Sequence, residues 1–170
     1  MMPGIVIATF GRQLLHSIDG TMLDTVIALI LGLVPISNGL GRVFIGFIND
    51  WFGMKFNIRF SSTLVFVGSL LVLLAFTTGV MAFLIAALIL MGFFAGMSVP
   101  SGAIVVRKLF GNQNFQINLQ VLFFAGLFNS LGTVIFGGVF DMTGGYLIPL
   151  VIISCIASLG ALSAFCIDKP

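Results

Sequence analysis

The sequence predicts an all-α protein, a polytopic bundle of transmembrane helices, on three observations. Of its 170 residues, 59% are hydrophobic and 7% are charged, whereas a soluble domain carries about 25% charged residues. The apolar runs are long, and they lack the alternation of apolar and polar residues that marks the strands of a transmembrane barrel. Helices satisfy their own backbone hydrogen bonds, so they can cross a bilayer. We therefore expect a single transmembrane domain over residues 1–170.

The chain begins with a short apolar stretch, residues 3–11, that is too short to cross a bilayer, because a span needs about 20 residues. The next residues, 12–24, are the most polar in the protein and place His16 in a loop. The first full helix starts at Asp24, which is positioned to cap its N-terminus, and contains Pro35, where we expect a kink. Five complete spans are predicted, at about 24–48, 60–77, 80–105, 116–139 and 146–166. Tight turns are expected at Thr77–Gly79 and Asp141–Gly145.

The basic residues orient these spans, because Lys and Arg accumulate in cytoplasmic loops. With five crossings, one side of the membrane receives Lys55, Arg59, Arg107, Lys108 and Lys169. Only Arg12 falls on the other side. The sequence thus predicts a multi-pass protein of the plasma (inner) membrane with a cytoplasmic C-terminus.

The odd number of spans and the partial helix at residues 3–11 indicate the later part of a larger transporter, whose first half is missing. The alternative is a genuine short N-terminal segment that lies in the membrane interface.

Arg42 is the most informative single residue, since it is a lone cation inside an apolar run. A charge at that depth costs on the order of 3 kcal/mol or more. Asn38 lies one turn away on the same helix face. One interpretation is that Arg42 snorkels to the headgroups or pairs with Asp50. The other is that it binds an anion in a water-filled cavity, because its planar fork of donors suits a carboxylate.

Three other sets of polar or small residues are candidates for a structural or functional role. Asn129 and Ser130 form interhelical hydrogen bonds or line a cavity. Gly92 and Gly96 have the spacing of a close helix contact. The lone His16 is a solvated side chain rather than a proton relay.

Catalytic chemistry is not predicted. The sequence has no second His for a metal site, no Gly-rich phosphate loop and no nucleophile with a supporting base and acid. We therefore expect no enzyme activity, no cofactor and no metal. The basic residues are scattered, so no nucleic-acid partner is expected either.

The spacing Gly46-x-x-x-Asp50-x-x-Gly53-x-Lys55 resembles the loop signature of the major facilitator superfamily. Three stretches resemble the oxalate/formate antiporter branch of that superfamily, NGLGRVFIGFINDWFG at 38–53, LFGNQNFQINLQVLFFAG at 109–126 and SLGTVIFGGVFDMTGGY at 130–146. Monocarboxylate transporters look similar. In this family the stretches belong to helices 8 and 11 of twelve, so the resemblance implies that the chain is the C-terminal half, from the end of helix 7 through helix 12.

The resemblance implies a secondary active transporter that moves a small carboxylate by alternating access, coupled to protons or to an exchanged anion. Arg42 matches the family's intramembrane arginine, which contacts the anionic substrate. Asn38, Asn129 and Ser130 are its candidate partners in the binding site. The family places such a site between two six-helix halves. The expected partners are therefore the lipid bilayer, the carboxylate and a missing N-terminal half.

The gating motif comprises Gly46, Asp50, Gly53 and Lys55. Asp50 matches the acid that latches onto a later helix. We expect it to lie against the start of the fourth span, near Gln116–Asn118, because a helix N-terminus carries about +0.5 charge.

Two departures from the family pattern affect these expectations. Trp51 and Met54 stand where the family usually has basic residues, which predicts a weak latch. No Lys or Arg occurs between Lys108 and Lys169, and this favours a monocarboxylate over a dicarboxylate. The alternative function is a non-transporting membrane interaction protein, or a truncated product that pairs with a full-length transporter.

Overall fold

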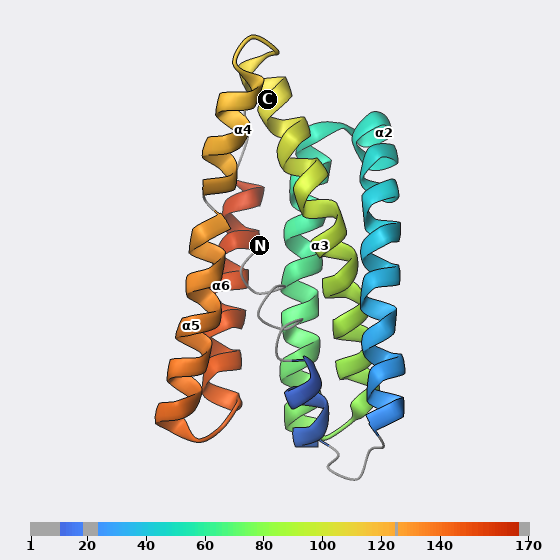
Figure 1. Ribbon diagram of the computed structural model, residues 1–170, viewed down its shortest axis with the longest axis vertical. Helices are drawn as coiled ribbons and strands as arrows, with labels where there is room; N and C mark the ends of the chain where they lie inside the picture. Colours follow the sequence, from blue (N-terminus) through green and yellow to red (C-terminus); the bar gives the residue numbers. More distant parts are fainter. Residues whose placement is uncertain (1–10, 19–23, 125, 167–170) are drawn as a thin grey trace.

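The computed structural model describes residues 11–18, 24–124 and 126–166, except the side chains of 127–129. Five labelled helices follow a short helical segment at 11–18. They are α2 (Asp24–Thr78), α3 (Met81–Phe110), α4 (Phe115–Phe124), α5 (Gly126–Thr143) and α6 (Leu147–Phe165) (Figure 1). No strand occurs among the described residues, so the all-α prediction is confirmed. The helices α2, α3 and α6 are long and apolar enough to cross a membrane.

Helix α2 is a bent helix whose 55 residues form two limbs. At ~1.5 Å per residue a straight helix of that length would far exceed the ~30 Å hydrocarbon core. Its backbone leaves helical angles at Gly53, with φ 79° and ψ 178°, a conformation that favours glycine because it has no Cβ. The first limb, residues 24–52, and the second limb, residues 54–78, run in opposite directions (Figure 1).

This bend corrects one expectation from the sequence. Lys55 and Arg59 lie on the helical second limb and not in a loop. The reason is that one glycine reverses the chain, so the helix resumes directly after it. The first limb also passes through Pro35 with helical backbone angles.

The other connections are also short. Gly79, with φ 69°, donates its N–H to the Ala75 carbonyl at 2.9 Å, which confirms the turn predicted there. Helix α3 continues past its predicted end at 105 to Phe110. The predicted fourth span corresponds to α4 and α5 together. Because α5 continues to Thr143, the last turn begins at Gly144, later than expected.

The core forms where α2 packs against α3 and, less extensively, against α6. Glycines bring α2 and α3 into close contact. Gly41 faces the Phe93 carbonyl, and Gly96 faces the Asn38 carbonyl. Gly92 lies against Val34 in the same way. The close contact predicted for Gly92 and Gly96 is therefore confirmed.

The segment 11–18 is helical, although the sequence predicted a polar loop there. Leu14 and Leu15 explain the difference, because both are 0% exposed within the core cluster. Burying two leucines fixes the segment against the bundle. Most of the predicted partial helix at 3–11 lies outside the described residues.

Helices α4 and α5 form a peripheral rod. Helix α4 has no buried residue, and among the labelled helices it contacts only α3 and α5, while α5 contacts α4 and α6. Phe136 is buried, and Phe140 stacks on Tyr146 at 4.4 Å between ring centroids. Neither α4 nor α5 packs against α2.

Candidate functional site

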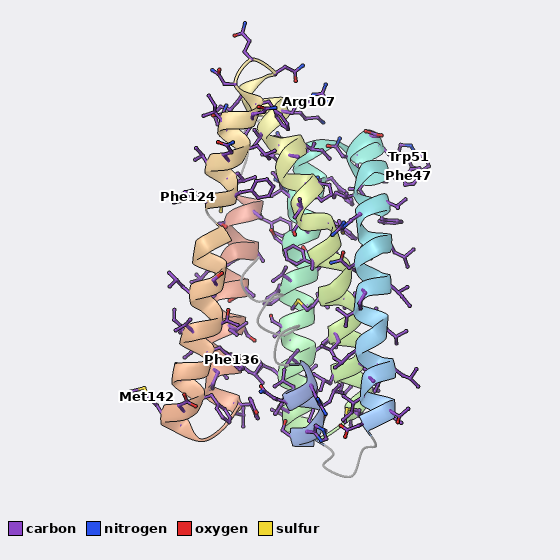
Figure 2. All side chains as sticks on the ribbon, in the orientation of Figure 1. Phe47, Trp51, Arg107, Phe124, Phe136 and Met142 are labelled. Atoms are coloured by element: carbon purple, nitrogen blue, oxygen red, sulfur yellow. The ribbon has the colours of Figure 1, made fainter. Side chains whose placement is uncertain are left out.

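Apart from Arg42, the cations of α2 and α3 gather at one end of the bundle, which we call the basic end: Lys55, Arg59, Arg107 and Lys108. Lys108 Nζ donates to Asn49 Oδ1 at 3.2 Å, which joins the end of α3 to the bend of α2. Arg59 Nη2 donates to the Phe165 carbonyl at 3.4 Å, which joins the second limb of α2 to the end of α6. Figures 1 and 2 show this end at the top, with Arg107 labelled.

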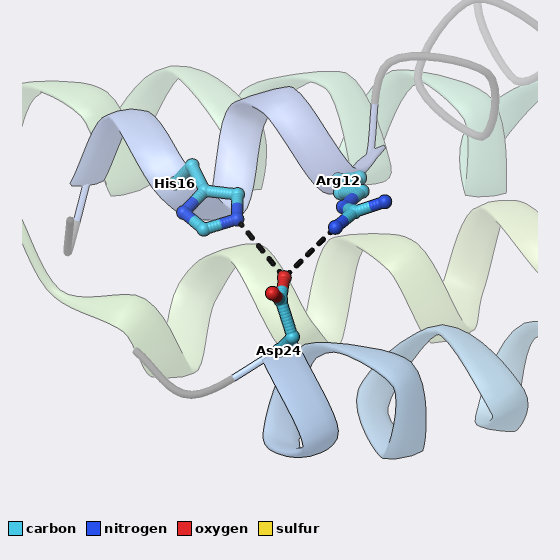
Figure 3. Close-up of polar contacts among 3 residues, drawn as sticks. All are labelled: Arg12, His16 and Asp24. Carbon is cyan, nitrogen blue, oxygen red and sulfur yellow. Dashed lines mark hydrogen bonds and ion pairs between the residues drawn. The ribbon is translucent and has the colours of Figure 1, made fainter. Parts of the chain in front are cut away.

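The opposite end carries a small ion-pair cluster (Figure 3). Arg12 Nη2 lies 2.8 Å from Asp24 Oδ1, and His16 Nε2 lies 3.6 Å from the same oxygen. The Arg12 and Asp24 side chains are 65% and 73% exposed, so water screens the pair and its contribution to stability is small. His16 is also well exposed, as expected for a solvated histidine.

Arg42 lies on the first limb of α2, eight residues before Asp50, or ~12 Å along the helix axis. Its side chain is exposed on the surface of the chain. No described residue forms an ion pair or a hydrogen bond with it, so the alternative pairing with Asp50 is not formed. Arg42 is therefore a cation in an apolar segment with no counter-ion among the described residues.

The first limb of α2 has three distinct faces, which follow from ~100° of rotation per residue. One face is buried against α3 and carries Ile45 and Ile48. A second is covered with large apolar side chains, and Phe47 and Trp51 point outward from it (Figure 2). The third face holds Arg42 with small or polar residues, which are Asn38, Gly32, Gly39, Gly46 and Asn49.

The predicted binding residues are only partly brought together. Asn38 lies one turn from Arg42 and is half-buried beside α3. Ser130 is exposed on α5, which does not contact α2, and the first limb and α5 lie at opposite edges of the bundle (Figure 1). The structure therefore does not bring Ser130 to Arg42, because α3 and the second limb lie between them. The Asn129 side chain falls outside the described residues.

The gating motif is dispersed around the bend. Gly46 belongs to the third face of the first limb, and Gly53 forms the bend itself. Asp50 is exposed, and α2 makes no contact with α4. The expected contact between Asp50 and Gln116–Asn118 is thus not formed in this conformation, since the end of α3 lies between the two elements.

Sequence reasoning missed a buried polar cluster near the basic end. Asn57 is 0% exposed, and its Oδ1 accepts hydrogen bonds from Ser61 Oγ at 3.3 Å and from Ser101 Oγ at 3.1 Å. These bonds tie the second limb of α2 to α3. The Asn57 Nδ2 group has no partner among the described residues. Asn57 and Ser61 lie four residues apart, and this spacing was the signal available in the sequence. It was missed because the region was predicted to be a loop.

Arg59 was also underestimated by sequence reasoning. Besides its bond to the Phe165 carbonyl, its guanidinium lies 5.6 Å from the centre of the Phe165 ring. A cation at the C-terminal end of a helix satisfies terminal carbonyls and complements the helix dipole. Arg59 therefore connects α2 to the end of α6.

The fold and these sites define an α-helical protein that has three helices long and apolar enough to cross a membrane, a cluster of cations at one end, and a cation, Arg42, without a partner among the described residues. Comparison of the sequence and structure with protein families, curated proteins and solved structures found no match.

Proposed function

We propose that the chain is the C-terminal half of a secondary active transporter for a small carboxylate, similar to the oxalate/formate branch of the major facilitator superfamily. The observation that carries this proposal is Arg42, a cation at membrane depth with no partner among the described residues. Removing a charge from water is costly unless a counter-ion or water reaches it. A carboxylate substrate in a hydrated cavity supplies that counter-ion.

A single cation favours a monocarboxylate over a dicarboxylate. The Arg42 guanidinium offers two parallel donors to one carboxylate, while Asn38, one turn away, offers a neutral amide to the rest of the substrate. The binding roles of Asn129 and Ser130 remain predictions, as does the gating role of Asp50. Coupling to protons or to an exchanged anion is part of the same proposal.

In the proposed carrier, a six-helix N-terminal half would cover the third face of the first limb. Gly32, Gly39 and Gly46 recur every seven residues, and each has open space where a Cβ would lie. Small residues permit close helix approach, and a spacing of seven suits helices that cross at about 20°. A helix docked on these glycines would separate Arg42 from lipid and enclose it.

The proposed topology has five spans, formed by the two limbs of α2, by α3, by α4 with α5, and by α6. The basic end is cytoplasmic because basic residues are retained on that side. A reporter enzyme fused after Pro170 should therefore be active only in the cytoplasm. Activity of the fused reporter outside the membrane would contradict this orientation.

Transport should require both halves. Cells that make only this chain should not accumulate labelled monocarboxylates, whereas cells that also make a matching six-helix N-terminal half should. Gly39→Leu should abolish co-purification of the halves, because the added side chain blocks close approach. Gly160→Leu is the matched control, since Gly160 is an open glycine on α6. Equal loss of co-purification in both variants would contradict docking at the third face.

A non-transporting membrane interaction protein is the second candidate, and the same three glycines favour it. It would bind a full-length transporter through the third face without moving substrate. Co-purification with a carrier, but no uptake in any combination of halves, would support this alternative over the first.

A further inference from the structure

A hollow of about 720 Å³ opens at the basic end, beside the bend of α2. Its lining combines two cations with apolar side chains: Phe52, Gly53, Met54, Lys55, Lys108 and Leu109. Lys55 comes from the first turn of the second limb, and Lys108 comes from the last turn of α3. The bend at Gly53 is what brings these two segments to one opening.

The electrostatics of the hollow favour an anion. None of the described residues that line it carries a carboxylate. Lys108 directs one donor to Asn49 Oδ1 at 3.2 Å, and an ammonium group has three donors, so its bond to Asn49 leaves further donors for a ligand. Arg59, at the same end, adds to the positive potential. An occupant with a negative, oxygen-rich group is therefore preferred.

The apolar lining gives the occupant a second property. Phe52 and Leu109 are 60% and 52% exposed, although both are large and apolar. Trp51 and Phe110, which flank them in the sequence, are also exposed, and Trp51 points away from the bundle (Figure 2). Exposed aromatic residues at the ends of membrane helices are typical of the interface with the headgroups. The occupant thus meets cations at its head and apolar surface along its length.

We propose that this hollow binds an anionic phospholipid, with the headgroup phosphate between Lys55 and Lys108 and the acyl chains along Phe52 and Leu109. Basic pockets between helices at the cytoplasmic side are suited to such headgroups. A soluble phosphate compound would use the lysines but leave the apolar lining in water. The inference goes beyond the proposed transport function and does not depend on it.

The test uses the full chain, purified in a neutral detergent, with dioleoyl phosphatidylglycerol and dioleoyl phosphatidylcholine as probes. Native mass spectrometry measures the bound lipid at each concentration. Phosphatidylglycerol should bind about 30-fold more tightly, since each basic residue near a lipid surface contributes about fivefold. Lys55→Gln and Lys108→Gln should each lose about fivefold, and the double variant should bind both lipids alike.

Arg107→Gln is the matched control, because it removes one charge from the same end but lies outside the lining, where it bonds to Asn112. It should retain binding of phosphatidylglycerol. A variant with both lysines changed to arginine should also retain binding, which separates loss of charge from misfolding. An equal loss in Arg107→Gln, or wild-type binding by the double glutamine variant, would overturn the proposal. Competition by soluble glycerol 3-phosphate at the same concentration as the lipid would overturn it as well, in favour of a soluble ligand.

Discussion

Arg42→Ala should nearly abolish carboxylate transport by the assembled carrier, and Arg42→Lys should reduce it at least about tenfold. The alanine variant leaves the substrate carboxylate without a counter-ion, and a charge-assisted hydrogen bond contributes about 1.5–3 kcal/mol. Lysine keeps the charge but presents a point cation in place of the planar fork. Initial uptake rates of a labelled monocarboxylate, normalised to protein in the membrane fraction, measure both effects.

Arg107→Ala is the control for this experiment, since it removes a cation from the basic end and not from the membrane interior. It should transport at close to the wild-type rate. A wild-type result for the lysine variant would assign Arg42 a different role. If Arg42→Lys transports with wild-type rate and affinity, Arg42 serves as a snorkelling anchor, because a lysine stem reaches the headgroups equally well.

Gly96→Ala should destabilise the chain by about 1–3 kcal/mol, the usual cost of overpacking a close contact. A Cβ at Gly96 would overlap the Asn38 carbonyl, which is backbone and cannot move without separating α2 from α3. These two helices share the most extensive contact in the described part of the chain. Thermal unfolding in detergent, followed by circular dichroism, should show a lower midpoint temperature.

Gly39→Ala provides the comparison, because Gly39 lies on the same helix as Asn38 and has open space around its Cβ position. It should change the stability of the isolated chain by no more than about 0.5 kcal/mol. Similar midpoint temperatures for Gly96→Ala and the wild type would mean that α2 and α3 are not tightly packed at Gly96.

Much of the fold could be predicted, because apolar runs and turn glycines identify helices and their ends. The all-α class, the start of α2 at Asp24 and the turn at Gly79 follow from such patterns. The bend at Gly53 was expected as a basic loop, since composition alone does not show that one glycine suffices to reverse the chain. The helix at 11–18 was missed because two leucines were hidden among polar neighbours.

The site was harder to predict than the fold. Arg42 was identified because a charge in an apolar run is costly wherever it lies. Its neighbours on other helices were not identified, because helix periodicity fixes which face a residue occupies but not which helices lie beside that face. Ser130 was accordingly placed opposite Arg42, although α5 and the first limb lie at opposite edges of the bundle. The cluster around Asn57 required knowledge of the contact between the second limb and α3.

The sparse contacts of α4 and α5 have a mechanical consequence. The block of α2, α3 and α6 holds nearly all of the buried apolar side chains, whereas the rod of α4 and α5 is attached to it at one end through α3 and at the other through α6. The free energy of opening is therefore distributed unevenly. We therefore expect the rod to open at a lower free energy than the contact between α2 and α3, and this opening has to withdraw Phe136 from the core cluster.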